Sequence, residues 1–209
     1  MSIDENKIEG NKQRLIKWCK AYIVSDKNKE GLERFLDFLE KSDFYTAPAS
    51  TRFHSNMDGG LCEHTLKVIS RMFKVCNAEL PPEETKTAEF KEKAFIVALC
   101  HDLCKVDFYK KSERNKKDEN GNWYSYPYWE IEDQLPMGHG EKSLYIAQKY
   151  FDLSDEMAIA IRWHMGFSDA AYKGGSYDIG SAFSSYPFAL YLSIADTMAS
   201  LLDEEVTKY

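Results

Sequence analysis

Residues 94–105 read Ala-Phe-Ile-Val-Ala-Leu-Cys-His-Asp-Leu-Cys-Lys, and the rest of the chain can be organised around them. The first seven residues have no polar face, which is typical of a helix in the centre of a globular protein. This apolar run ends on the adjacent pair His101-Asp102, and Lys105 follows three residues later. An imidazole and a carboxylate at the end of a buried helix predict a functional site at that position.

The composition is that of one globular domain. The chain has 209 residues, of which 44% are hydrophobic, enough for one buried core and short for two domains. It has neither an apolar run of membrane-spanning length nor the basic flank and apolar stretch of a signal peptide, so we expect a cytoplasmic protein without a membrane partner. The net charge of −7 argues against binding of duplex nucleic acid but permits a small phosphorylated ligand. The five cysteines form no CxxC pair, which argues against a disulfide framework or a zinc ribbon.

Apolar residues at helical spacing predict helices along most of the chain. We expect helices at 13–25, 29–41, from 61 onward, and at 87–103, 140–151, 154–165 and 186–202. Residues 1–12 are polar and predict a frayed end, and residues 166–185, rich in Gly, Ser and Tyr, predict a loop. Asn120-Gly121-Asn122 is a strong turn signal before an aromatic segment that contains Pro127, which favours a short edge hairpin or an ordered flap.

The five histidines of the chain are distributed so that four of them flank predicted helices. His64 lies near the start of one helix, His101-Asp102 near the end of another and His139 before a third, while His164 ends a fourth. Asp196 lies inside an apolar helix, where an unpartnered carboxylate is costly. Imidazole and carboxylate suit first-row divalent ions, which lower the pKa of bound water and neutralise phosphoryl oxygens. We therefore expect these side chains to converge on one or two metal ions that support hydrolysis of a phosphate ester.

The ordered set of these six residues resembles the signature of the HD-domain metal-dependent phosphohydrolase superfamily, in its form with extra histidines. The stretch Gly59-Gly-Leu-Cys-Glu-His64 is similar to a segment of bacterial HD-domain 3′-to-5′ exoribonucleases, and His101-Asp-Leu-Cys-Lys105 is similar to the His-Asp-x-x-Lys box. The resemblance covers roughly residues 50–203. It leaves outside the first forty or so residues and the insertion at 106–137.

The resemblance implies a role for each residue. His64, His101, Asp102 and Asp196 would hold a first metal ion, and Asp102 would bridge to a second ion held by His139 and His164. A single ion is the alternative, and the metal is one of Mn, Fe, Mg, Ni, Co or Zn. A metal-activated hydroxide would attack the phosphate, which Lys105 would contact as a point charge. Independently of the resemblance, we expect Glu63 to orient a ligand histidine by accepting a hydrogen bond from its far N–H, as carboxylates commonly do beside metal-bound histidines.

Two features of the sequence keep alternative interpretations open. His54 precedes the Gly59-Gly60 turn and is a candidate general acid toward the leaving group, or else a residue that supports a metal ligand or a plain loop residue. The aromatic segment Trp123–Trp129 could stack on nucleobases, or it could be a packing or dimer surface.

The expected fold is all-α, a compact HD-domain bundle of about seven or eight helices with a small β-hairpin insertion. Residues 1–45 would form an N-terminal helical hairpin packed on the core, and residues 46–209 the HD domain with its insertion at about 106–137. The expected function is metal-dependent hydrolysis of a phosphomonoester or phosphodiester of a nucleotide or short oligonucleotide. A 3′-to-5′ exoribonuclease, a metal-bearing nucleotide-binding regulatory module and a di-iron oxygenase are the alternatives. A short single-stranded RNA and a second copy of the chain stay open as partners.

Overall fold

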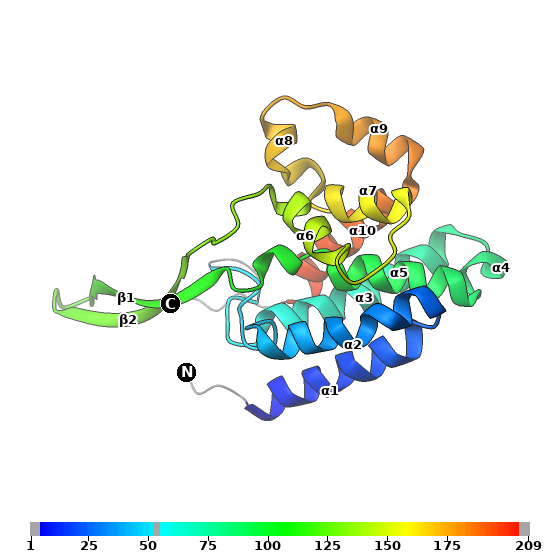
Figure 1. The fold of residues 1–209 in the computed structure, drawn as a ribbon. Helices are drawn as coiled ribbons and strands as arrows, with labels where there is room; N and C mark the ends of the chain where they lie inside the picture. Colours follow the sequence, from blue (N-terminus) through cyan, green and yellow to red (C-terminus); the bar gives the residue numbers. More distant parts are fainter. Residues whose placement is uncertain (1–4, 52–54, 205–209) are drawn as a thin grey trace.

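A computed structural model of the protein describes residues 5–51 and 55–204, and these residues form a helical bundle with one hairpin (Figure 1). The described part contains ten α-helices, eight of them at least seven residues long, and a two-stranded antiparallel sheet. This confirms the all-α fold class and the hairpin insertion. None of the helices in the described part combines the length and apolar character needed to cross a bilayer.

The centre of the bundle consists of four helices, α3 (Gly60–Glu79), α5 (Ala88–Cys100), α7 (Asp155–Trp163) and α10 (Pro187–Met198), which pack on one another. Helix α5 is buried on nearly all sides, as its uniformly apolar sequence predicts. Its N-terminus is capped by Thr87, whose hydroxyl accepts a hydrogen bond from the backbone N–H of Phe90. Helix α6 (His139–Ala147) packs beside α7, and the four-residue helix α4 (Pro82–Thr85) connects α3 to α5.

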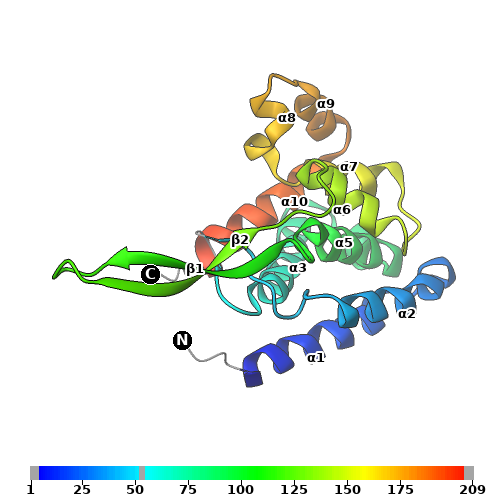
Figure 2. The same ribbon diagram turned by 60° about the vertical axis from the view of Figure 1, so that its left-hand side comes forward.

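Helices α1 (Glu5–Tyr22) and α2 (Asp26–Lys41) cover one side of this centre (Figures 1 and 2). Their buried side chains belong to the same hydrophobic core as those of α3 and α5. Helix α1 begins at Glu5, so the expectation of a frayed end up to residue 12 is wrong. Tertiary contacts stabilise its first turns, because Lys7 forms an ion pair with Glu63 of α3 and Ile8 lies against Gly59.

The hairpin consists of β1 (Tyr109–Lys117) and β2 (Trp123–Ile131) and projects away from the helices (Figures 1 and 2). The strands pair from Tyr109 opposite Ile131 to Lys117 opposite Trp123. Gly121 has a φ of 84° in the connecting turn, as the Asn-Gly-Asn signal predicts. A 3₁₀ turn at Leu103–Lys105 joins α5 to the segment that leads into β1.

The segment between α7 and α10 is more regular than the sequence predicts. After a 3₁₀ turn at Gly166–Ser168, the short helices α8 (Ala170–Lys173) and α9 (Asp178–Ser185) occupy the predicted loop. Ile179 and Ala182 of α9 pack with Trp163 in a small cluster apart from the main core. So few apolar residues, among Gly and Ser, give too weak a periodic signal to predict a helix. Helix α10 continues into a π-helical turn, Ala199–Asp203.

Candidate metal centre

Six of the predicted site residues meet at the middle of the bundle. They form two groups, within each of which the potential ligand atoms all lie within 4.8 Å of one another. The first group contains His64, His101 and Asp196, and the second contains Asp102, His139 and His164. The side chains come from five helices or their ends, so that the fold brings together residues separated by more than a hundred positions in the chain.

Each side chain is placed by a helix end or by a packed helix face. His64 is the fifth residue of α3, whose start is fixed by Gly59 with a φ of 77°. Gly60 follows, and a Cβ atom there would lie 2.0 Å from the carbonyl oxygen of Ser55. His101 and His164 cap the C-termini of α5 and α7, where each Nδ1 lies 2.7 Å from a backbone carbonyl of the preceding turn.

Asp102 lies between the two groups. Its Oδ2 atom faces the first group, 3.3 Å from Nε2 of His64 and 3.4 Å from Nε2 of His101. Its Oδ1 atom faces the second group, 2.9 Å from Nε2 of His139 and 3.7 Å from Nε2 of His164. A carboxylate with one oxygen directed at each group has the arrangement that bridges two cations.

The donor atoms of the first group have spacings that suit one metal ion. Nε2 of His64 lies 3.0 Å from Nε2 of His101 and 3.2 Å from Oδ1 of Asp196. Ligands at about 2.1 Å from an ion, the usual metal–nitrogen distance, are about 3.0 Å apart at right angles and about 3.4 Å apart in a tetrahedron. The observed separations lie in this range.

A buried nitrogen without a hydrogen-bond partner indicates the second position. Nδ1 of His164 donates a hydrogen bond to the carbonyl oxygen of Ile161, 2.7 Å away, so Nε2 is the ring nitrogen that is left to bind a cation. Within the described residues this Nε2 is buried and has no hydrogen-bond partner. Buried polar atoms are rarely left in this state, and a cation at this point would satisfy the nitrogen. The residues present therefore fit a divalent ion in each group.

A comparison with protein families matches residues 61–204 to the HD domain, which is more than half of the chain. The chain belongs to the HD-domain family. Neither the comparison with curated proteins nor that with solved structures finds a match. Membership of the family agrees with the resemblance inferred from the sequence, whereas the more specific likeness to exoribonucleases finds no support in these comparisons.

We call the two groups together, His64, His101 and Asp196 with Asp102, His139 and His164, the HD centre. Its histidines and carboxylates differ in how their surroundings shift their pKa values. Burial lowers the pKa of His101 and of His139, which keeps both imidazoles neutral and available as ligands. Burial also opposes the charged form of His64, but Asp102, Asp196 and Glu204 outweigh it and hold the pKa of His64 well above its ordinary value. The burial of Asp102 is likewise outweighed, by Lys105 and the neighbouring imidazoles, so that the pKa of Asp102 is lowered.

Lys105 and His54 were also predicted to belong to the site, and the structure describes only Lys105. The Lys105 ammonium lies 2.7 Å from Oδ2 of Asp102, so the lysine belongs to the same site. Burial alone would lower the pKa of Lys105, but the charge of Asp102 dominates and raises it. His54, the candidate general acid, lies outside the described residues.

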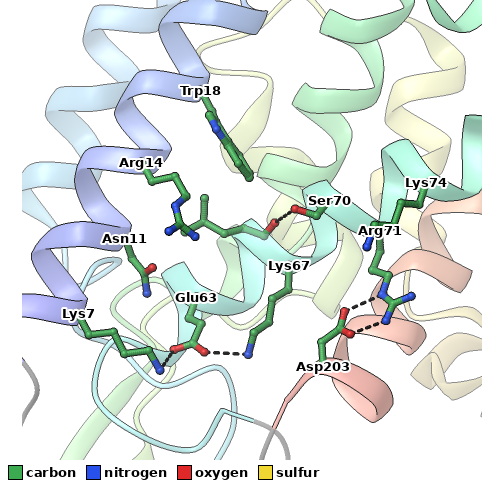
Figure 3. Close-up of a pocket in the computed structure, with 11 residues that line it drawn as sticks. Lys7, Asn11, Arg14, Trp18, Glu63, Lys67, Ser70, Arg71, Lys74 and Asp203 are labelled. Carbon is green, nitrogen blue, oxygen red and sulfur yellow. Dashed lines mark hydrogen bonds and ion pairs between the residues drawn. The ribbon is translucent and has the colours of Figure 1, made fainter.

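The predicted role of Glu63 is wrong, and Glu204 occupies the corresponding position. Glu63 forms ion pairs with Lys7 of α1 and with Lys67 of α3 (Figure 3). Nδ1 of His64 instead lies 2.7 Å from Oε1 of Glu204, whose other carboxylate oxygen accepts a hydrogen bond from the Ser55 hydroxyl. The sequence offers no signal for this role of Glu204, which follows Asp203 in an acidic segment at the end of the π-helical turn.

A pocket of about 350 Å³ lies between α1 and α3 (Figure 3). Trp18 and several cationic side chains line it, together with Glu63 and Asp203. None of the six candidate ligands belongs to its lining. The two acidic residues of the pocket adjoin His64 and Glu204 in the chain, so the pocket and the HD centre share the start of α3 and the end of the π-helical turn.

Proposed function

We propose that this HD-domain protein is a metal-dependent phosphohydrolase that cleaves a phosphomonoester or phosphodiester of a nucleotide or short oligonucleotide. The observation that carries the proposal is the position of Asp102, with one oxygen directed at each group of imidazoles. Two anions, the ester and its attacking hydroxide, must approach each other in this reaction. Divalent cations held at the site would reduce the repulsion between them.

Each residue has a proposed task. His64, His101 and Asp196 would hold one divalent ion, His139 and His164 a second, and Asp102 both. Such ions supply the acidification of bound water and the neutralisation of phosphoryl oxygens. The metal is one of Mn, Fe, Mg, Ni, Co or Zn.

Lys105 would contact a phosphate oxygen of the substrate. Its position beside Asp102 supports this role, since its ammonium group stays charged at neutral pH and is nearly buried. An ammonium in such a water-poor place stabilises developing negative charge more strongly than it would in bulk water. His54 would protonate the leaving group.

The test combines metal analysis with hydrolysis assays. The purified protein is stripped with a chelator and loaded in turn with Mn²⁺, Fe²⁺, Mg²⁺, Ni²⁺, Co²⁺ or Zn²⁺. Metal content is measured per chain, and turnover is measured on aryl phosphate monoesters and diesters, mononucleotides and short RNA. We expect close to two ions per chain and turnover of at least one of these esters, with both lost in Asp102→Ala.

Asp152→Ala is the matched control, because this exposed aspartate pairs only with Lys27 among the described residues. It should retain metal and activity. Normal activity in Asp102→Ala would refute the assignment of the site. Hydrolysis of RNA but not of mononucleotides would favour an exoribonuclease. Tight nucleotide binding without turnover would favour a regulatory module, and oxygen consumption by the iron-loaded protein would favour an oxygenase.

A further inference from the structure

The hairpin has a charge opposite to that of the rest of the protein. Strands β1 and β2 together carry five cationic and two acidic side chains, a net charge of +3 in a chain whose total is −7. The same strands carry six aromatic residues, namely Tyr109 in β1 and Trp123, Tyr124, Tyr126, Tyr128 and Trp129 in β2. A basic and aromatic arm on an acidic body is a separate functional feature.

The register of the strands sorts these side chains onto two faces. Residues directly opposite each other in an antiparallel pair point to the same side, and successive residues alternate. Arg114 therefore shares a face with Tyr126, Lys116 with Tyr124, and Ser112 with Tyr128. We call this the tyrosine face; its members are Lys110, Ser112, Arg114, Lys116, Tyr124, Tyr126, Tyr128 and Glu130.

The tyrosine face combines rings and cations at contact distance. The ring centroids of Tyr124 and Tyr126 lie 6.3 Å apart, and the Arg114 guanidinium lies 4.0 Å from the ring centroid of Tyr128. Within the described residues the two strands pair with each other and make no extensive contact with a helix, and the arm points into solvent (Figures 1 and 2).

The root of the hairpin is fixed beside the HD centre. Tyr109, the first residue of β1, follows Lys105 by four positions. Lys111 forms an ion pair with Asp58, in the loop that precedes α3 and His64, with an N–O distance of 2.7 Å. A strand of nine residues at about 3.3 Å per residue extends roughly 30 Å from this root. A ligand that lies along the arm would thus reach the HD centre at one end.

We propose that the tyrosine face binds single-stranded nucleic acid and holds the part of the strand outside the HD centre, an inference that rests on the proposed phosphohydrolase function. Bases of any sequence stack on aromatic rings, and interleaved cations contact the phosphates between them. The charge of the arm favours a polyanion. The face contains no aliphatic side chain, whereas the buried centre of a dimer interface is apolar, so a second copy of the chain fits it less well.

Binding is measured first, without turnover. Labelled single strands of RNA and of DNA, each about twelve nucleotides long, are titrated in the presence of EDTA, with a duplex of the same length for comparison. The triple variant Y124A/Y126A/Y128A should bind each single strand at least about tenfold more weakly than the native protein. Y124F/Y126F/Y128F keeps the rings and should bind within a few-fold of the native protein. The relative affinities of the RNA and DNA strands show which of the two the arm prefers.

Charge is tested on the same face. K110Q/R114Q/K116Q should reduce the slope of log affinity against log salt by about two, since each phosphate contact on a single strand contributes about 0.7. Tyr177→Ala is the matched control, because this tyrosine is 84% exposed and lies between α8 and α9, away from the arm (Figure 1). It should bind the strand like the native protein, and the melting temperature of every variant is checked.

The outcomes separate this proposal from the function on which it rests. Loss of strand binding in the alanine triple, with no hydrolysis of any ester under any metal, supports the arm and refutes the phosphohydrolase. The proposed role of the arm alone is refuted if small esters are hydrolysed and the native protein binds no single strand. It is also refuted if small esters are hydrolysed and Y124A/Y126A/Y128A binds the strands as tightly as the native protein. A change from dimer to monomer in the alanine triple by sedimentation, with strand binding unchanged, would assign the face to a second copy instead.

Discussion

At the scale of single residues, the contact between Gly140 and α7 sets the second group of the HD centre. A Cβ atom at Gly140 would lie 2.0 Å from the carbonyl oxygen of Arg162, so a larger residue must push α6 away from α7. His139 precedes this glycine, and His164 follows Arg162 by two positions. The close approach therefore fixes the spacing of the two imidazoles, whose ring centroids are 5.2 Å apart.

We predict that Gly140→Ala loses occupancy of the second metal position while the first is retained. The strain should also lower the free energy of unfolding by about 1–3 kcal/mol. Metal content per chain and urea unfolding measure the two effects. Gly180→Ala is the control, since nothing lies within 4 Å of a Cβ atom there and alanine is favoured inside a helix. Two ions per chain in Gly140→Ala would contradict this account.

Glu204 acts on His64 as a positioning residue. Its buried carboxylate accepts the Nδ1 proton, which directs Nε2 of the ring toward Asp102 and Asp196. We predict that Glu204→Ala weakens binding at the first metal position by about 10–100-fold, the usual cost of removing such a partner. Glu204→Gln should lie between the two proteins, because an amide oxygen still accepts the proton without the charge. Competition with a chromophoric chelator measures the affinities.

Asp203→Asn provides the comparison for Glu204. This neighbouring acid pairs with Arg71 on the other side of the chain (Figure 3). Its substitution should leave metal affinity unchanged. If Asp203→Asn lowers the metal affinity as much as Glu204→Ala does, the effect comes from a shift of the segment 203–204 and not from loss of the hydrogen bond between His64 and Glu204.

At the scale of elements, Glu92 connects α5 to the start of α2. Its carboxylate accepts hydrogen bonds from the backbone N–H groups of Val24 and Ser25, from the Ser25 hydroxyl and from the Asn28 amide. Glu92 is only 5% exposed, so its removal leaves several buried donors without a partner. We predict that Glu92→Ala lowers the free energy of unfolding by about 3 kcal/mol. Glu33→Ala, on the exposed side of α2, should change it by less than about 0.5 kcal/mol in the same urea titration.

A pair of aspartates joins the end of α2 to the root of the hairpin and makes stability depend on pH. The backbone N–H of each residue donates to the carboxylate of the other, with Asp107 N–H 2.7 Å from Oδ1 of Asp43. Burial, and then the nearby charge of Asp107, raises the pKa of Asp43 from 3.8 to about 6. The folded state therefore binds more protons than the unfolded state between these values, and this pair favours folding less as the pH rises from about 4 to 6.

We predict that Asp43→Asn removes this part of the pH dependence. Because the site is partly exposed, the contribution is about 1 kcal/mol. The variant should match the native protein near pH 4 and exceed it in stability near pH 7.5, since the amide can accept the Asp107 hydrogen bond without a charge. Urea unfolding at both pH values, compared between the two proteins, is the measurement. Equal stability of the native protein and Asp43→Asn at pH 7.5 would show that the charge of Asp43 does not destabilise the folded state.

The sequence predicted the elements better than the contacts between them. Apolar periodicity identified the long helices, and the His-Asp pair with its partner histidines identified the six candidate ligands, because both signals are local or use rare residue types. Helix α9 was not predicted, because its buried surface consists of little more than Ile179 and Ala182. The contact of Glu204 with His64 was not predicted, because an acidic residue near other acidic residues has no distinctive pattern. Only the fold shows that it reaches His64.

At the scale of the whole molecule, the two groups of the HD centre connect elements from both ends of the fold. Candidate ligands lie on α3, α6 and α10 and at the ends of α5 and α7, so bound ions would link most of the central bundle. The like-charged carboxylates of Asp102 and Asp196 both approach Nε2 of His64 there, at 3.3 and 3.2 Å, and Nε2 of His164 has no hydrogen-bond partner among the described residues. Cations would relieve these contacts in the folded state, and the unfolded chain has no such site.

We therefore predict that the melting temperature rises with the concentration of the preferred metal and falls on chelation. Binding to the folded state alone adds about 2.7 kcal/mol at a hundredfold excess over Kd, which shifts the melting temperature by several degrees for a chain of this size. The shift should be absent in Asp102→Ala, which removes the ligand shared by both positions, and only reduced in His164→Ala, which leaves the first group whole. A full shift in Asp102→Ala would place the bound ions elsewhere in the protein, whatever the hydrolysis assays show.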